Sequence, residues 1–243
     1  MYYLRYFIYI AVNWNLKVAW FTIKHEMRGE RKYGLNTSKI ADIKKFSKPG
    51  VNIEHAENYQ GANYYLLEEV FAFIQNITAE EETKNFPGKI RSVNNLLDYG
   101  CGKGRVLAVA SCFDFKKITG IDFVNELCKA ARKNIIPFQQ EFPEKIFNVI
   151  KTDAVDYVIE NDTNTFFFFN PFDEIVMQAV VKNILLSLKN NPREVYVIYI
   201  NPVHKEIFLS AGFEQIYHLE KLHYIQVSVF IKSVEDDIHI GSV

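Results

Sequence analysis

The chain has 243 residues, of which 49% are hydrophobic and 23% are charged, and its formal net charge is -1. This composition fits a folded domain with a sizeable core and excludes an intrinsically disordered chain. The near-neutral charge gives no strong signal of nucleic-acid binding, because a protein that grips a duplex through its phosphates usually carries a basic face.

The N-terminal residues are rich in aromatic side chains. Apolar residues recur there at alternating three- and four-residue spacing, which predicts a helix with one apolar seam formed by Leu4, Phe7, Ala11, Trp14, Val18 and Phe21. The apolar run at residues 6–12 is too short to span a bilayer, and no signal-peptide cleavage site follows it. We expect residues 1–24 to pack on the domain or on a partner, for example as a homodimer, with a membrane surface as the alternative.

Further along, residues 26–32 form a charge cluster that we expect to be a solvated face, and residues 64–77 have the period of an apolar helix. From residue 93 onward, strands and helices alternate. Five strands are predicted at residues 93–99, 117–122, 147–151, 165–169 and 194–200, a sixth starts at Gly212, and the last covers residues 224–232. Helices are predicted at residues 105–112, 124–134, 175–188 and 204–211. Repeated strand–helix units predict an α/β fold with a doubly wound, mostly parallel seven-stranded sheet whose last strand is antiparallel.

The first predicted strand runs into a glycine-rich loop, Asp98-Tyr99-Gly100-Cys101-Gly102-Lys103-Gly104. Such a turn leaves room for a ligand to approach the backbone, which suits either a dinucleotide or S-adenosylmethionine. Dinucleotide sites use the spacing G-x-G-x-x-G, but here Arg105 stands where the third glycine is needed. The acid Asp98 also suits the positively charged methionine end of S-adenosylmethionine. The spacing therefore favours S-adenosylmethionine over the alternative of a nicotinamide-dependent oxidoreductase.

With this loop, the sequence resembles the class I S-adenosylmethionine-dependent methyltransferases, over about residues 90–232. The resemblance implies a helical N-terminal extension at residues 1–90, a methyltransferase domain at residues 91–243, and S-adenosylmethionine as cofactor. It implies that the cofactor is bound by Asp98, Gly100, Cys101, Gly102 and Gly104. The chain is also similar to uncharacterised bacterial methyltransferase-like proteins, including at residues 29–34, and to non-SET lysine methyltransferases.

Two acids follow later strands in the order that the family shows. Asp122 ends the second strand, 24 residues after Asp98, and the resemblance implies that its carboxylate accepts hydrogen bonds from both ribose hydroxyls, with Phe123 beside it. Asp153 and Ala154 follow the third strand, where the family binds adenine. Asp156 is the competing acid at this position, although it is also placed to start a helix.

The fourth strand ends in Asn170-Pro171-Phe172, followed by Asp173. This element resembles the Asn-Pro-Pro-Tyr motif of methyltransferases that modify planar amino groups, except that Phe172 replaces the second proline. We predict that Asn170, Pro171 and Phe172 are catalytic and that Asn170 also contacts the cofactor. An asparagine oxygen and a proline carbonyl can both accept from an NH₂ group, which holds the amine in line for transfer. The alternative is that the motif only starts a helix.

Other residues are weaker candidates. Asn201-Pro202 follows the fifth strand and could form a substrate-side wall, His204 could act as a base, and residues 59–65 could lie over the methionine end of the cofactor. No metal site is expected, since the histidines are scattered without ligand spacing. The cysteines, Cys101, Cys112 and Cys128, have neither disulfide nor zinc spacing, which predicts buried reduced thiols and a cytoplasmic protein.

The function we predict is methyl transfer to a nitrogen of a protein or other acceptor. An RNA or small-molecule methyltransferase is the first alternative, and a non-catalytic protein that binds S-adenosylmethionine is the second.

Overall fold

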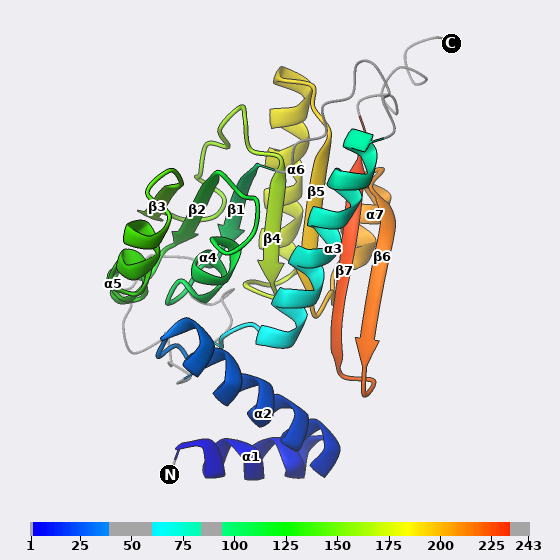
Figure 1. The fold of residues 1–243 in the computed structure, drawn as a ribbon. Coiled ribbons are helices and arrows are strands. Elements are labelled where there is room, and N and C mark those ends of the chain that lie inside the picture. The colour runs from blue at the N-terminus through cyan, green and yellow to red at the C-terminus, as the bar shows by residue number, and fades with distance from the viewer. Residues whose placement is uncertain (1, 39–59, 84–93, 234–243) are drawn as a thin grey trace.

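The computed structural model describes residues 2–38, 60–83 and 94–233. The described helices and strands are, in chain order, α1 (Tyr2–Asn13), α2 (Leu16–Tyr33), α3 (Tyr64–Thr83), β1 (Asn95–Tyr99), α4 (Arg105–Ala110), β2 (Lys117–Asp122), α5 (Asn125–Glu141), β3 (Ile146–Lys151), β4 (Thr165–Phe169), α6 (Glu174–Asn190), β5 (Val195–Ile200), α7 (Lys205–Ser210), β6 (Glu214–Lys221) and β7 (Ile225–Lys232). Figure 1 shows the helices flanking one twisted sheet.

The sheet has seven strands in the order β3-β2-β1-β4-β5-β7-β6. β7 pairs antiparallel with both β5 and β6, whereas the other neighbouring pairs are parallel. The predicted fold class, a mostly parallel doubly wound sheet with an antiparallel last strand, is confirmed. The central strands β4 and β5 are apolar on both faces and almost wholly buried, as strands covered by helices on both sides must be.

Two hydrophobic clusters cover the two faces of the sheet. Because side chains alternate along a strand, Leu96 of β1 belongs to one cluster and Leu97 to the other. Buried residues of α2, α3, α4 and α5 complete the first cluster, and α6 and α7 complete the second. The first cluster joins residues on both sides of the predicted domain boundary, for example Phe71 of α3 and Phe167 of β4. The boundary at residue 90 itself lies outside the described residues and stays a prediction.

The N-terminal segment forms two helices, so the prediction of a single helix with one seam is wrong. Asn15 caps α2, accepting a hydrogen bond from the Val18 amide at 2.9 Å, and α1 ends at Asn13. α1 buries Tyr6 and Ile10 instead of the predicted seam, so Leu4 is 63% exposed, and Trp14, which lies between the two helices, is 44% exposed. Figure 1 shows α1 and α2 at the end of the sheet where β4 and β6 terminate, as their arrowheads indicate.

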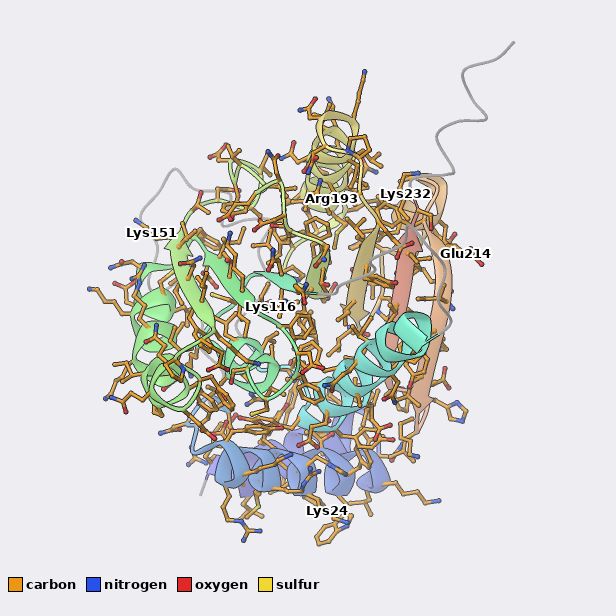
Figure 2. The ribbon with its side chains drawn as sticks, turned by 45° about the horizontal axis from the view of Figure 1, so that its top comes forward. Lys24, Lys116, Lys151, Arg193, Glu214 and Lys232 are labelled. Atoms are coloured by element: carbon orange, nitrogen blue, oxygen red, sulfur yellow. The ribbon has the colours of Figure 1, made fainter. Side chains whose placement is uncertain are left out.

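The outer side of these two helices carries exposed apolar side chains, namely Leu4, Ile8, Val12, Leu16 and Trp20. Lys24 lies on the same outer, solvent side of α2 (Figure 2). A contact of residues 1–24 with a second subunit, a partner or a membrane surface stays a prediction. None of the helices that the structure describes has both the length and the apolar character needed to cross a bilayer.

The cysteines are free thiols, and Cys101 and Cys128 are buried as predicted. Cys112 is exposed, so the expectation that it is buried is wrong. It lies two residues after the end of α4, in the turn that leads to β2.

Candidate functional site

The glycine-rich loop lies at the carboxyl end of β1 and adopts a left-handed backbone. The φ angles of Gly100, Gly102 and Gly104 are 75°, 53° and 79°, a region that only glycine enters without strain. The loop is fixed to β2, because the amides of Gly100 and Cys101 both donate to the carbonyl of Ile121 at 2.9 Å. The loop therefore presents a glycine backbone with little side-chain cover at the edge of the sheet.

The loop also touches the chain that follows β4. A Cβ atom on Gly100 would lie 2.8 Å from the Cβ of Pro171, closer than real side chains approach one another. The structure thus brings together two predicted elements, the cofactor loop and the Asn170-Pro171 turn, which are 70 residues apart in the sequence. Glycine at position 100 is required both by its φ angle and by this contact.

Asp122 lies at the end of β2 and is buried. Its Oδ2 accepts from the Gly102 amide at 3.0 Å and its Oδ1 accepts from the Val124 amide at 2.8 Å. Burial raises the pKa of Asp122 to about 6, although the two amides act in the opposite direction. Each carboxylate oxygen keeps a second lone pair, so the group can still accept from the two hydroxyls of a ribose. Phe123, which follows it, is partly exposed.

Asp98 is the second buried acid of this edge, with 2% of its surface exposed. Among the described residues, nothing donates a hydrogen bond to its Oδ2. Burial, together with the negative charge of Asp122, raises the pKa of Asp98 well above its usual range. A buried carboxyl oxygen without a partner costs free energy, which a cationic ligand group would recover. This orphaned oxygen fits the amino group at the methionine end of S-adenosylmethionine.

Asn170 follows β4 in a conformation that favours asparagine or glycine, with a φ angle of 40°. Its Oδ1 is buried and has no hydrogen-bond partner among the described residues. It stands beside the cofactor loop, since Pro171 contacts Gly100. The turn therefore offers an unused acceptor oxygen beside the glycine-rich loop.

Phe172 is 7% exposed and its ring meets Phe168 edge-on, with centroids 6.3 Å apart. In this position it packs in the second hydrophobic cluster, and its predicted catalytic role stays a prediction. Asp173 caps α6 by accepting from the Val176 amide at 3.2 Å, so the motif does precede a helix, but Pro171 lies outside that helix.

Asp153 and Ala154 lie in the turn after β3, and both are partly buried. The Oδ1 of Asp153 accepts from the Val155 amide at 3.0 Å. Asp156 is exposed in the same turn and starts no helix, so the expectation that it begins a helix is wrong, whereas its role as the competing acid stays a prediction. The predicted adenine contact of Asp153 and Ala154 stays a prediction.

A buried ion cluster, which the sequence did not reveal, connects α2 to the start of α4. The guanidinium of Arg105 pairs with the carboxylates of Glu26 and Glu30, and Arg105 Nε donates to Thr37 Oγ1 at 2.8 Å. The guanidinium also lies 4.2 Å from the centre of the Tyr64 ring. The expectation that residues 26–32 form a solvated face is therefore wrong for both glutamates, because Arg105 neutralises charge that would otherwise forbid burial.

Glycines make room for this cluster. A Cβ on Gly61 would lie 2.3 Å from the Arg105 guanidinium carbon, and one on Gly29 would lie 2.1 Å from the Tyr64 ring. The carbonyl of Ala62 accepts from Arg105 at 2.7 Å. These contacts fix α2 and the segment before α3 against the helix that follows the cofactor loop.

A cavity of about 570 Å³ lies at the same edge of the sheet. Its lining comes from α1, α2, residues 60–63, the start of α3, the ends of β4 and β5, and the turn between β6 and β7. Asn201 lines the cavity, whereas His204 is not among its lining residues, and the role of Asn201 as a substrate-side wall stays a prediction. Gln60, Gly61 and Asn63 from the predicted covering segment line it too, while Tyr59 lies outside the described residues.

Sequence reasoning missed the contributions of His223, Tyr224 and Gln226 to this cavity. The signal was present in the predicted topology. β6 runs in the same direction as β5 and is followed by its antiparallel partner β7. The turn between β6 and β7 therefore lies at the carboxyl edge of the sheet. In this turn the φ angles are 55° at Leu222 and 63° at His223.

The described residues contain no group of three or more His, Cys, Asp or Glu side chains that could hold a metal ion.

Residues 66–183 match the family model described as a methyltransferase domain. This segment is a class I methyltransferase domain. The chain is accordingly an enzyme that uses S-adenosylmethionine as methyl donor, and the match does not specify the acceptor. The unpartnered oxygen of Asp98 and the two carboxylate oxygens of Asp122 can accept hydrogen bonds, and the amino group and ribose hydroxyls of this cofactor can donate them.

The fold is shared with solved methyltransferase structures. A protein from Pyrococcus horikoshii, provisionally assigned as an RNA methyltransferase, is 16% identical, with a TM-score of 0.51 over 85% of this chain and 96% of its own. The methyltransferase domain of a bacterial Hen1 protein is 17% identical, with a TM-score of 0.51 over 70% of this chain and 99% of its own. A protein from Escherichia coli, provisionally assigned as a methyltransferase, is 13% identical, with a TM-score of 0.50 over 70% and 86%. No curated protein matches the sequence significantly.

Proposed function

We propose that this enzyme transfers the methyl group of S-adenosylmethionine to a nitrogen atom of its acceptor, and that Asn170 and Pro171 hold that nitrogen. The observation that carries the proposal is the buried, unpartnered Oδ1 of Asn170 beside the cofactor loop. An oxygen atom in that position accepts a hydrogen bond from an N–H group and has nothing to offer a carbon acceptor.

In this proposal the cofactor is held at three strand ends. Asp98 accepts from its amino group, Asp122 from its ribose hydroxyls and Asp153 from its adenine amino group, with Phe123 and Ala154 against the base. The backbone of Gly100, Cys101, Gly102 and Gly104 gives the cofactor room to approach. Bound S-adenosylmethionine supplies a methyl group made electrophilic by its positively charged sulfur.

The protein's own residues then position the acceptor. Asn170 Oδ1 and the carbonyl of Pro171 accept from the acceptor N–H groups, so that the nitrogen lone pair faces the methyl carbon. Orientation of this kind accounts for most of the rate in a displacement between two bound groups. Phe172, packed against Phe168, fixes the turn that carries these two acceptors. We place this activity in the cytoplasm, consistent with the free thiols of Cys101 and Cys128.

The proposal is tested by replacing Asn170 in two ways. Asn170→Gly keeps the backbone conformation at φ 40° and removes the oxygen, whereas Asn170→Asp keeps an oxygen in the same place. Labelled S-adenosylmethionine, incubated with an extract of cells that lack the protein, reports methyl transfer by the added enzyme. We expect Asn170→Gly to lower the rate by about 100-fold or more, and Asn170→Asp to retain more of it.

Three outcomes contradict the proposal. If Asn170→Gly transfers methyl as fast as the unaltered enzyme, Asn170 does not position the acceptor. If both variants bind S-adenosylmethionine normally and the label is found on carbon or oxygen only, the acceptor is not a nitrogen. An enzyme that binds the cofactor and labels nothing would favour the alternative of a non-catalytic binding protein.

A further inference from the structure

We propose that the cavity between the N-terminal helices and the sheet edge is the acceptor site, and that its acceptor is a small organic amine with an apolar body. This inference rests on the proposed function and adds the chemical class of the acceptor.

The cavity lies where an acceptor must enter. Its lining includes Phe169, the last residue of β4 and the neighbour of Asn170, and Ile200, the last residue of β5. The cavity therefore reaches the residue that precedes Asn170, whose Oδ1 is buried and has no partner among the described residues. Its volume of about 570 Å³ falls within the range of about 300–1,000 Å³ usual for sites of small molecules.

Aromatic rings from α1 form one wall. Tyr6 and Tyr9 line the cavity together with Trp14, which follows α1, and Tyr224 joins them from the β6–β7 turn. The rings of Tyr9 and Trp14 lie 6.0 Å apart at an angle of 72°, so they form a corner with two ring faces. Such faces attract an apolar body and, through the ring quadrupole, an ammonium group.

The charge of the cavity wall selects a cation. Glu26 lines the cavity, and its carboxylate shares one guanidinium, that of Arg105, with the carboxylate of Glu30. Two carboxylates and one guanidinium carry a formal charge of -1 together. The pKa of Glu30 is lowered, despite its burial, by hydrogen bonds from Thr37 and by Arg105, so Glu30 is ionised at neutral pH.

The other titratable lining residues do not reverse this charge. No lysine or arginine is found among the described residues that line the cavity. His223 lines it from the hairpin turn, where its imidazole meets the carboxylate of Glu220 at 2.9 Å. A phosphate or carboxylate acceptor would meet no lysine or arginine among the described lining residues, whereas an amine would meet a carboxylate and aromatic faces.

An amine acceptor can take part in the proposed methyl transfer. The amine enters as an ammonium ion and must lose a proton to solvent before it reacts. Its lone pair then forms the new carbon–nitrogen bond as the carbon–sulfur bond breaks, and the sulfur keeps that electron pair. The product is a methylated ammonium ion, which loses a further proton to solvent if it is to react again.

The two tryptophans of the chain provide a test. Trp14 lines the cavity, whereas Trp20 does not and is 68% exposed. In the Trp20→Phe variant, Trp14 is the remaining tryptophan, so fluorescence excited at wavelengths that tyrosine does not absorb reports on the cavity. The Trp14→Phe variant keeps only Trp20 and is the matched control. The probes are benzylamine, phenethylamine and hexylamine, compared with benzoate, phenylacetate, hexanoate and adenosine monophosphate, all with saturating S-adenosylhomocysteine.

We expect the amines to change the emission of Trp20→Phe and not that of Trp14→Phe, with affinities at least tenfold above those of the anions. We expect Glu26→Gln to weaken amine binding about tenfold. Glu30→Gln, which also removes a partner of Arg105 but lies outside the cavity lining, should change it less than twofold.

Each of three results would overturn the inference. The anions bind as tightly as the amines or more tightly, the amines give no fluorescence response, or Glu26→Gln and Glu30→Gln have equal effects. Calorimetric titration of S-adenosylmethionine into the same preparations tests the proposed function independently of this inference. If the cofactor binds and is turned over while the amines do not bind, only the assignment of the acceptor fails.

Discussion

At the scale of single residues, the proposed cofactor site contains two buried acids. Asp98 and Asp122 lie at adjacent strand ends, and burial raises the pKa of each. A raised pKa means that the folded, ligand-free protein holds protons on these groups at a pH where free aspartate is ionised. Binding of a cationic cofactor favours the ionised form, so binding must release protons.

This coupling gives a pH dependence with a definite sign. Because the pKa of Asp122 is raised to about 6, protonation of Asp122 alone should lower the affinity for S-adenosylmethionine about fivefold between pH 6 and pH 5, and protonation of Asp98 should add to this loss. Titrations in buffers of different ionisation enthalpy should show proton release on binding. In Asp122→Asn the slope should be smaller, since one of the two titrating groups is gone. Affinity that is constant between pH 5 and 7 would contradict this role of the two acids.

At the scale of elements, Arg105 holds the N-terminal helices to the cofactor half of the molecule. Its side chain is 2% exposed, and it bonds to α2 through Glu26 and Glu30 and to the segment before α3 through Ala62. Removing one member of a buried ionic group leaves an uncompensated charge, which costs more than the group contributes when it is intact.

Arg105→Met should therefore lower the free energy of unfolding by about 3–5 kcal/mol. Arg28→Met is the matched control, because Arg28 of α2 pairs with Glu68 of α3 but its side chain is 41% exposed. Exposed pairs of this kind contribute at most about 1 kcal/mol. Urea unfolding of both variants measures the difference, and similar small losses would show that Arg105 is not a structural tie.

Local patterns predicted the elements of the sheet well. The strands at residues 117–122 and 165–169 occur with the predicted bounds, because their apolar runs are short and end in loop residues. The helix predicted at residues 124–134 continues as α5 through Pro137 to Glu141. There the apolar stripe goes on, with Ile135 and Phe138 buried, and this burial offsets the cost of a proline within a helix.

Features that depend on distant partners could not be read in the same way. Glu26 looked solvated because its partner, Arg105, lies 79 residues away in the sequence. The contact between Gly100 and Pro171 likewise exists only once the sheet has formed. The candidate site residues could be proposed from sequence because each follows a strand and resembles a family motif, whereas the cavity needed the folded structure.

At the scale of the whole molecule, the N-terminal helices and the sheet share one core, since residues of α2 and α3 join the cluster that covers β1 and β4. Both tryptophans, Trp14 and Trp20, lie in the N-terminal segment, so their fluorescence reports on that segment alone. Far-ultraviolet circular dichroism reports on all helices and strands. We expect the two signals to change in one coincident transition on thermal unfolding. An earlier fluorescence transition would show that residues 1–38 unfold separately.

The cofactor site itself can be examined by calorimetric titration of S-adenosylmethionine, and of its demethylated product, into the purified protein and into Asp122→Ala. We predict one site per chain in the unaltered protein. In the variant, loss of hydrogen bonds to a charged group should weaken binding by about 10- to 100-fold. If the unaltered protein binds neither molecule, or if Asp122→Ala binds them equally well, the assignment of this sheet edge as the cofactor site is wrong.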